Sequence, residues 1–340
     1  MSVSRRQLEA AVAADIIDSK QAEHLYQFLT AQDESTPRFD FTHVLYYFGA
    51  CVAIGAMTLF MNLGWETFGG WGIVAITLIY GALGLGLRRY FANKHLLIPA
   101  GICATFTVAL TPLAVYGLQQ ALGFWPSDFD YQDYHRHIHW LWVYMELATL
   151  AVAVLMVWRY RYPFIVLPIA LTLWYLSMDA TALILGRVAN FDLRSLVSLY
   201  SGLLMIILAI WVQWRSQAKD YSFWLYIFGV AAFWGGLTVQ DSDSELAKLG
   251  YLFINLVLMM SGVVLLRRVF VVFGALGCSF YLGHLAFDLF EDSWWLPISL
   301  SLIGLLIIYL GVVWQRHEAM LSQRMRAWLP QPLQDFLRQL

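Results

Sequence analysis

The sequence predicts an all-α, polytopic membrane protein of about ten transmembrane helices in a bundle of helical hairpins, with both termini cytosolic. Composition is the first reason: of 340 residues, 60% are hydrophobic and 13% are charged, whereas a soluble domain is about half apolar and a quarter charged. Second, the apolar residues fall into segments near the length of about 20 helical residues that crosses a bilayer. Third, the basic residues gather in alternate loops.

We expect residues 1–40 to form a cytosolic helical hairpin and a linker. Ser4 with Gln7, and Asp18 with Gln21, have the spacing of capping boxes that begin two short helices. The segment is too polar for a cleavable signal peptide, so we expect insertion to begin with the first membrane helix. Leu8–Leu29 forms either a local cap or a surface for a cytosolic partner or a second copy.

Residues 41–314 form the predicted transmembrane domain. Its ten expected spans cover approximately residues 43–63, 70–90, 96–118, 140–158, 163–185, 195–214, 222–240, 248–266, 270–290 and 296–314. The three cysteines, Cys51, Cys103 and Cys278, fall inside these apolar segments, where small packing residues are expected rather than a disulfide or a metal set.

The basic residues test the span count independently. With cytosolic termini, only Arg136, Arg187, Arg194 and Lys248 of the 21 Lys and Arg residues lie in outer loops. Basic residues concentrate in cytosolic loops of membrane proteins, so the alternation supports an even number of spans. The net charge of -2 and the lack of a long basic run give no reason to expect a nucleic-acid partner.

Residues 315–340 are expected to lie on the cytosolic membrane surface. Gln315–Leu329 has an amphipathic helical pattern, Pro330 follows it, and a second apolar stripe begins at Leu333. Arginines beside such a stripe are typical of a helix that lies in the interface with anionic lipid.

Six polar residues inside the spans are the candidate site. On the expected topology all lie in the outer half of the membrane, and together they predict an outward-facing polar cavity: Asn62, Glu146, Asp179, Asn255, His284 and Asp288. An ionisable residue inside a membrane is costly and is a functional hypothesis by default. The alternative is that these residues form hydrogen bonds between helices and only fix their packing.

The ninth span carries one distinctive stripe. Gly274, Gly277, Tyr281, His284 and Asp288 follow one another at spacings of three and four residues, so they share a helical face. Glycines permit close approach of a neighbouring helix, so we expect the stripe to face protein or water. His284 and Asp288 could form a pair that exchanges a proton near neutral pH.

A metal site is the weaker interpretation of the loop before the fourth span. His135, His137 and His139 alternate and would converge only on an extended strand; no further ligand has diagnostic spacing, and a wet interfacial loop is the favoured interpretation. We therefore expect no metal and no cofactor. No HExxH, GxSxG, Walker or CxxC motif occurs, so nothing indicates an enzyme.

Residues 1–90 resemble a known family. The helical unit Leu8–Leu29 followed by a hairpin that begins at Leu45-Tyr-Tyr-Phe-Gly49 and continues through Asn62-Leu-Gly-Trp65 is similar to bacterial membrane proteins catalogued under domain of unknown function 2157. The resemblance implies a bacterial inner-membrane protein and brings no catalytic or binding residues.

The sequence therefore favours a carrier or channel for a small polar or ionic solute, proton-coupled through Asp179, His284 and Asp288. A non-transporting scaffold or sensor that works through its two cytosolic ends is the alternative. An intramembrane enzyme acting on lipid-linked substrates is a third hypothesis and has the least support.

Overall fold

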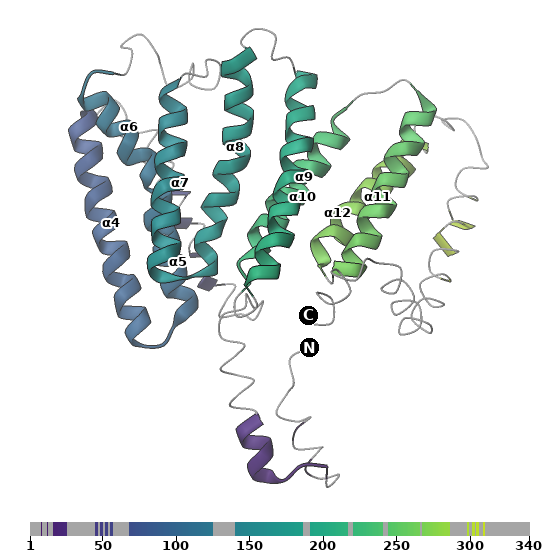
Figure 1. Cartoon of the computed structure of the whole chain (residues 1–340), viewed down its shortest axis with the longest axis horizontal. Helices are drawn as coiled ribbons and strands as arrows, with labels where there is room; N and C mark the ends of the chain where they lie inside the picture. Colours follow the sequence, from purple (N-terminus) through teal and green to yellow (C-terminus); the bar gives the residue numbers. More distant parts are fainter. Residues whose placement is uncertain are drawn as a thin grey trace. The chain divides into compact units, whose positions relative to one another are not determined.

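A computed structural model of the chain describes residues 16–25, 68–124, 140–185, 191–216, 220–240, 244–265 and 267–285, with isolated positions within 8–12, 45–56 and 298–309. Within these residues the regular structure is entirely helical (Figure 1). The all-α class is therefore confirmed. The described chain divides into two compact units, residues 1–184 with 215–225 and residues 185–214 with 226–340.

Within the described part of the chain, six helical segments are long and apolar enough to cross a membrane, namely Gly69–Asn93, Leu97–Ala121, Trp140–Tyr160, Pro163–Thr181, Phe191–Arg215 and Glu245–Leu265. Two further apolar helices, Ser222–Thr238 and Arg268–His284, are shorter. These helices coincide with the second to ninth predicted spans. The first span, 43–63, and the tenth, 296–314, lie outside the described residues apart from isolated positions, as does the tail 315–340.

The first unit is built on α4 (Gly69–Asn93), α5 (Leu97–Ala109), α6 (Thr111–Ala121), α7 (Trp140–Tyr160) and α8 (Val166–Leu185). The third predicted span is thus two consecutive helices. Pro112 explains the break, because proline lacks the N–H that would bond to the carbonyl four residues earlier and its ring clashes with that carbonyl.

A buried core closes the end of this unit where α4, α5 and α7 have their loops. It contains Ala100, Ala104, Ala153, Met156 and Ile165, all at most 9% exposed. The turn from α7 to α8 passes through Arg161, whose φ is +56°. The Tyr221 hydroxyl donates a 2.8 Å hydrogen bond to the Arg161 carbonyl. Burial raises the pKa of Tyr221, and the Arg161 cation opposes this, so the hydroxyl remains a donor at neutral pH.

The second unit contains two helical hairpins that pack through glycines. In α9 (Phe191–Arg215) and α10 (Ser222–Thr238), a Cβ added to Gly202 would overlap the α10 backbone at Phe233. The Ser198 hydroxyl also donates to the Ala232 carbonyl at 2.9 Å. Small residues let backbones approach closely, which is the usual basis of helix association in lipid.

The other hairpin, α11 (Glu245–Leu265) and α12 (Arg268–His284), is packed in the same way. Gly274 and Gly277 are buried and lie against α11 at Met259 and Asn255. Tyr281 is also buried, at 9% exposed. The prediction that this stripe faces protein is therefore confirmed for its first three members.

The N-terminal segment is described only in part. Residues 19–25 are helical, and the Asp18 backbone N–H donates to Gln21 Oε1 at 3.1 Å. This is the reciprocal bond of a capping box, so the predicted second start is confirmed. The first start, at Ser4, lies outside the described residues.

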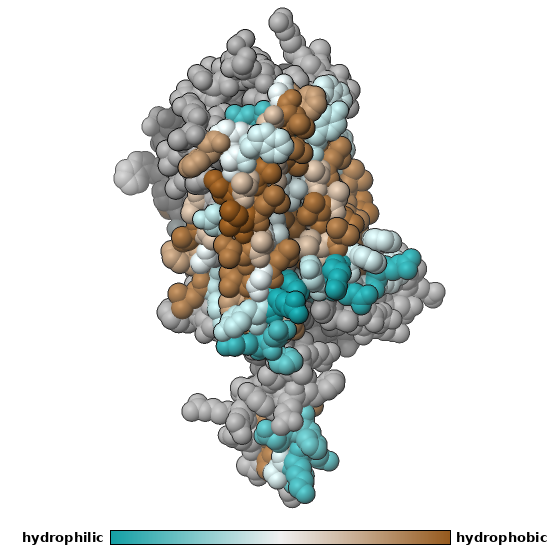
Figure 2. Space-filling model, turned by 90° about the vertical axis from the view of Figure 1, so that its left-hand side faces the viewer, coloured by the Kyte–Doolittle hydropathy of each residue, from teal (hydrophilic) through white to brown (hydrophobic). Residues whose placement is uncertain are grey.

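Large apolar side chains cover the outer surface of the helices. On α4, Leu78, Leu83 and Leu87 are about half exposed or more, and Trp158 on α7 is 72% exposed. Figure 2 shows this apolar surface in brown, with hydrophilic residues in teal gathered toward its lower end. Such extended apolar surface is suited to contact with lipid rather than water, which agrees with an integral membrane protein.

Candidate functional site

The described candidate residues fall into two groups, one in each unit. Glu146 and Asp179 belong to the first unit, and Asn255 and His284 belong to the second. Asn62, Asp288 and the loop histidines His135, His137 and His139 lie outside the described residues. Among the described residues no group of three or more His, Cys, Asp or Glu side chains is arranged to hold a metal ion.

Glu146 on α7 and Asp179 on α8 have their carboxyl groups close enough to interact with each other. Glu146 lies 14 residues before the end of α7, and Asp179 lies 13 residues after the start of α8. At about 1.5 Å per residue, antiparallel helices joined by a short turn bring these positions to the same height. The pairing therefore follows from the hairpin register.

The chemistry of this pair requires a proton. An ionised carboxylate only accepts hydrogen bonds, so two carboxyl groups bond to each other only when one carries a proton. Glu146 is only 9% exposed, and its Oε2 atom is buried without a hydrogen-bond partner within the described residues. A shared proton reduces the charge that two acidic groups would otherwise place inside an apolar bundle.

Gln119 adds a polar group to the interior of the same unit. It lies on α6, is 7% exposed, and donates from Nε2 to the Leu141 carbonyl of α7 at 3.0 Å. That carbonyl lies five residues before Glu146, close to one and a half helical turns. Gln119 has one polar neighbour on α7 but no charge pattern around it, so sequence reasoning did not identify it.

Among the second unit's described residues, Asn255 is the most deeply buried polar one, at 0% exposed. Its Nδ2 donates to the Tyr251 carbonyl one turn earlier at 2.8 Å. Its Oδ1 is buried without a hydrogen-bond partner among the described residues and lies against Gly277 of α12. The geometry at this position is that of tight helix packing.

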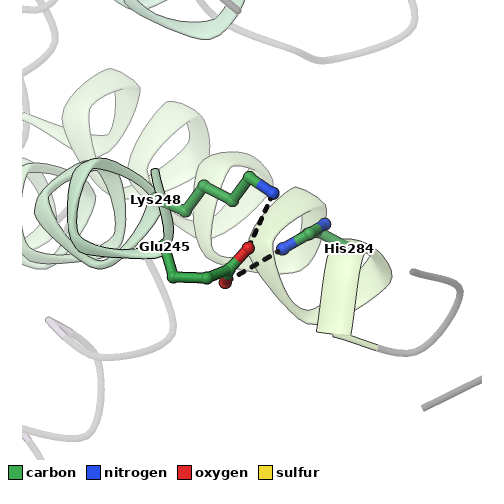
Figure 3. A network of polar contacts seen from close by, with 3 residues as sticks. All are labelled: Glu245, Lys248 and His284. Atoms are coloured by element: carbon green, nitrogen blue, oxygen red, sulfur yellow. Dashed lines mark hydrogen bonds and ion pairs between the residues drawn. The ribbon is translucent and has the colours of Figure 1, made fainter. Parts of the chain in front are cut away.

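His284 takes part in a polar cluster at the end of the α11–α12 hairpin away from its turn (Figure 3). Its Nε2 lies 3.5 Å from Glu245 Oε2, and Lys248 Nζ lies 2.8 Å from Glu245 Oε1. The His284 side chain is 17% exposed, whereas that of Glu245 is 55% exposed. The described partner of His284 is thus Glu245, which sequence reasoning missed because Glu245 precedes the predicted span.

The helices and their polar pairs define an all-helical protein with apolar helices consistent with integral membrane insertion. Comparison of the chain with protein-family models, with curated proteins and with solved structures finds no match. The arguments for function therefore rest on the residues themselves.

Proposed function

We propose that this chain is a transport-class membrane protein, a carrier or channel for a small polar or ionic solute, coupled to protons through Glu146 and Asp179. The observation that carries the proposal is the approach of these two carboxyl groups to each other on two apolar helices. A residue pair that must hold a proton in one arrangement can release it in another, which is the chemistry that proton coupling requires.

The proposed cycle depends on the geometry of α7 and α8. While the helices keep the carboxyl groups in contact, the shared proton is held away from water. A small shift that separates Glu146 from Asp179 exposes each group to a different environment, and repulsion between two carboxylates then favours proton uptake before the pair re-forms. His284, in the second unit, provides a second group that can carry a proton.

The proposal includes ten spans, cytosolic termini and a location in a bacterial inner membrane. The described helices that coincide with eight predicted spans support the count, and the placement of basic residues supports the orientation. The three-part division at residues 40 and 314, and a role of Leu8–Leu29 in binding a cytosolic partner or a second copy, are parts of the same proposal.

Solvent access is the first property to measure. Single cysteines replace Glu146, Asp179 or Asn255 in a variant that lacks Cys51, Cys103 and Cys278, and intact cells are treated with a membrane-impermeant thiol reagent. A polar outer cavity predicts labelling at 146 and 179. Protection of both positions, with labelling of a surface control at Asp192, contradicts the cavity.

Proton movement is the second measurement. Purified protein in liposomes is given a potassium diffusion potential, and a trapped pH-sensitive dye reports proton entry. We expect faster acidification than in protein-free liposomes, and loss of the increment in both Glu146→Gln and Asp179→Asn. Asp192→Asn, which alters an exposed carboxyl group on α9, is the matched control. Equal rates in all variants contradict a role of the pair.

A second candidate function is supported by Asn255. Its complete burial against Gly277 is the arrangement of a polar residue that only packs, as expected of a non-transporting scaffold or sensor that works through its cytosolic N- and C-terminal helices. Protection of positions 146, 179 and 255 from the thiol reagent, together with absence of proton entry, favours this alternative.

A further inference from the structure

Two arginines from different helices share one aromatic ring at the loop end of the first unit. The Arg88 guanidinium carbon lies 4.0 Å from the centre of the Tyr160 ring, and the Arg159 guanidinium carbon lies 5.3 Å from the same centre. Arg88 belongs to α4, and the other two residues end α7. Both cations therefore contact the same ring.

The platform beneath them is preformed. Arg88 lies on the same face of α4 as the buried residues Thr77 and Gly84, because the spacings of seven and four residues return to one side of a helix. Tyr160 packs against the buried core of Ala100, Met156 and Ile165. A ring held by a rigid core fixes the position of the cations that stack on it, so little side-chain freedom remains to be lost when an anion binds.

The positive charge at this end is uncompensated within the described residues. Arg88, Arg89, Lys94 and Arg159 have no carboxylate partner there; Arg88 and Arg159 contact the Tyr160 ring, and Lys94 contacts the Tyr90 ring. The Nε of Arg88 is buried without a hydrogen-bond partner in the described part of the chain. An unsatisfied buried N–H donor is unfavourable, and an oxyanion placed beside it would relieve that condition.

We infer that Arg88 and Arg159, stacked on Tyr160, bind the phosphate group of an anionic phospholipid. Guanidinium is planar and presents a fork of N–H donors that matches phosphate oxygens, and it can stack on an aromatic ring at the same time. Basic pockets between membrane helices are suited to acidic headgroups. The site requires no part of the proposed transport function.

The surroundings favour a lipid over a soluble phosphate. Leu87 precedes Arg88 and is 49% exposed, and Leu155 and Trp158 on α7 are 60% and 72% exposed. These exposed apolar side chains are close in sequence to the arginines on the same two helices. The phosphodiester of a lipid would contact the arginines while its acyl chains contact the apolar side chains, whereas inorganic phosphate would contact only the arginines.

The test is a titration of the detergent-solubilised full chain with short-chain phosphatidylglycerol, followed by native mass spectrometry of the protein–lipid complex. We expect one lipid to bind more tightly than phosphatidylcholine of the same chain length. Arg88→Gln with Arg159→Gln should weaken that binding about 30-fold, the effect of about two basic side chains near an anionic surface. Equal binding of the two lipids to the wild-type protein overturns the inference.

A charge-matched variant separates this site from general attraction. Arg89→Gln with Lys94→Gln removes the same charge from the same loop end but leaves both groups on Tyr160, and we expect phosphatidylglycerol affinity within about threefold of wild type because the stacked pair is intact. Equal weakening in both double variants would show diffuse electrostatics and overturn the site.

Folding and ligand source need their own measurements. Arg159 is exposed, so Arg159→Gln alone should keep the thermal unfolding temperature of wild type and still weaken lipid binding about fivefold, as expected for one cation. Unchanged lipid affinity in this variant counts against the site. Inorganic phosphate at millimolar concentration should not displace the lipid; full displacement would identify a soluble-phosphate site instead.

Discussion

Asn255 of α11 lies directly against Gly277 of α12, with its side chain in the space that a Cβ atom at position 277 would occupy. The glycine therefore permits the buried amide, and the amide prevents any larger residue there. This relationship joins the two features of the hairpin that stand out in the sequence, a polar residue inside one helix and a glycine stripe on the next. Substitution of either residue therefore tests the contact between α11 and α12.

Gly277→Ala is expected to destabilise the protein by about 1–3 kcal/mol, because the added methyl group overlaps the Asn255 side chain. Thermal unfolding in detergent measures the effect. Gly283→Ala is the control, since a Cβ at 283 on the same segment meets nothing within 4 Å. The loss should shrink when Asn255→Ala is present as well. Equal stability of Gly277→Ala and Gly283→Ala would contradict the packing.

Neighbouring glycines on α10 should respond in opposite ways. A Cβ at Gly236 would overlap the α9 backbone at Ser195 and Leu199, whereas one at Gly235 meets nothing within 4 Å. We expect Gly236→Ala to destabilise by about 1–3 kcal/mol and Gly235→Ala to be neutral or stabilising by up to about 1 kcal/mol, since alanine favours helix. The thermal unfolding temperatures of the two variants, measured under identical conditions, test this difference, and equal temperatures would contradict it.

The carboxyl pair predicts a spectroscopic signal. Because the carboxyl groups of Glu146 and Asp179 lie close together in an apolar bundle, we expect them to share a proton, and wild type should show the infrared carbonyl stretch of a protonated carboxylic acid at neutral pH. Glu146→Gln removes one of the two carboxyl groups that would share the proton, so the band should disappear while the fold is kept. A wild-type spectrum that matches the Glu146→Gln spectrum in this region would rule out a shared proton.

The Glu245–His284 contact should be measurable as a small coupling energy. A double-mutant cycle with Glu245→Gln and His284→Gln, followed by thermal unfolding, should show that the two substitutions together destabilise less than the sum of their separate effects. The coupling should have the small size of an exposed pair, since exposed pairs are weak. Strictly additive effects of the two substitutions would contradict the contact.

Local pattern and hydropathy predicted much of the fold. The second to ninth spans coincide with described helices because the length of an apolar helix follows from bilayer thickness. The capping pair Asp18 and Gln21 was likewise predictable, since it depends on residues three apart. The first and tenth spans stay predictions, as does the single cavity that would unite Glu146, Asp179, Asn255 and His284.

By itself the sequence determined that this is a helical chain suited to a membrane and which face of α12 packs on its neighbour, because both depend on composition and helical periodicity. Only the tertiary structure decided which polar side chains meet. Glu146 lies near Asp179, and His284 lies near Glu245. Such pairs depend on hairpin register and helix rotation, which sequence spacing within one helix does not encode. The same holds for Arg88 and Arg159, which converge because two helix ends are packed on one core.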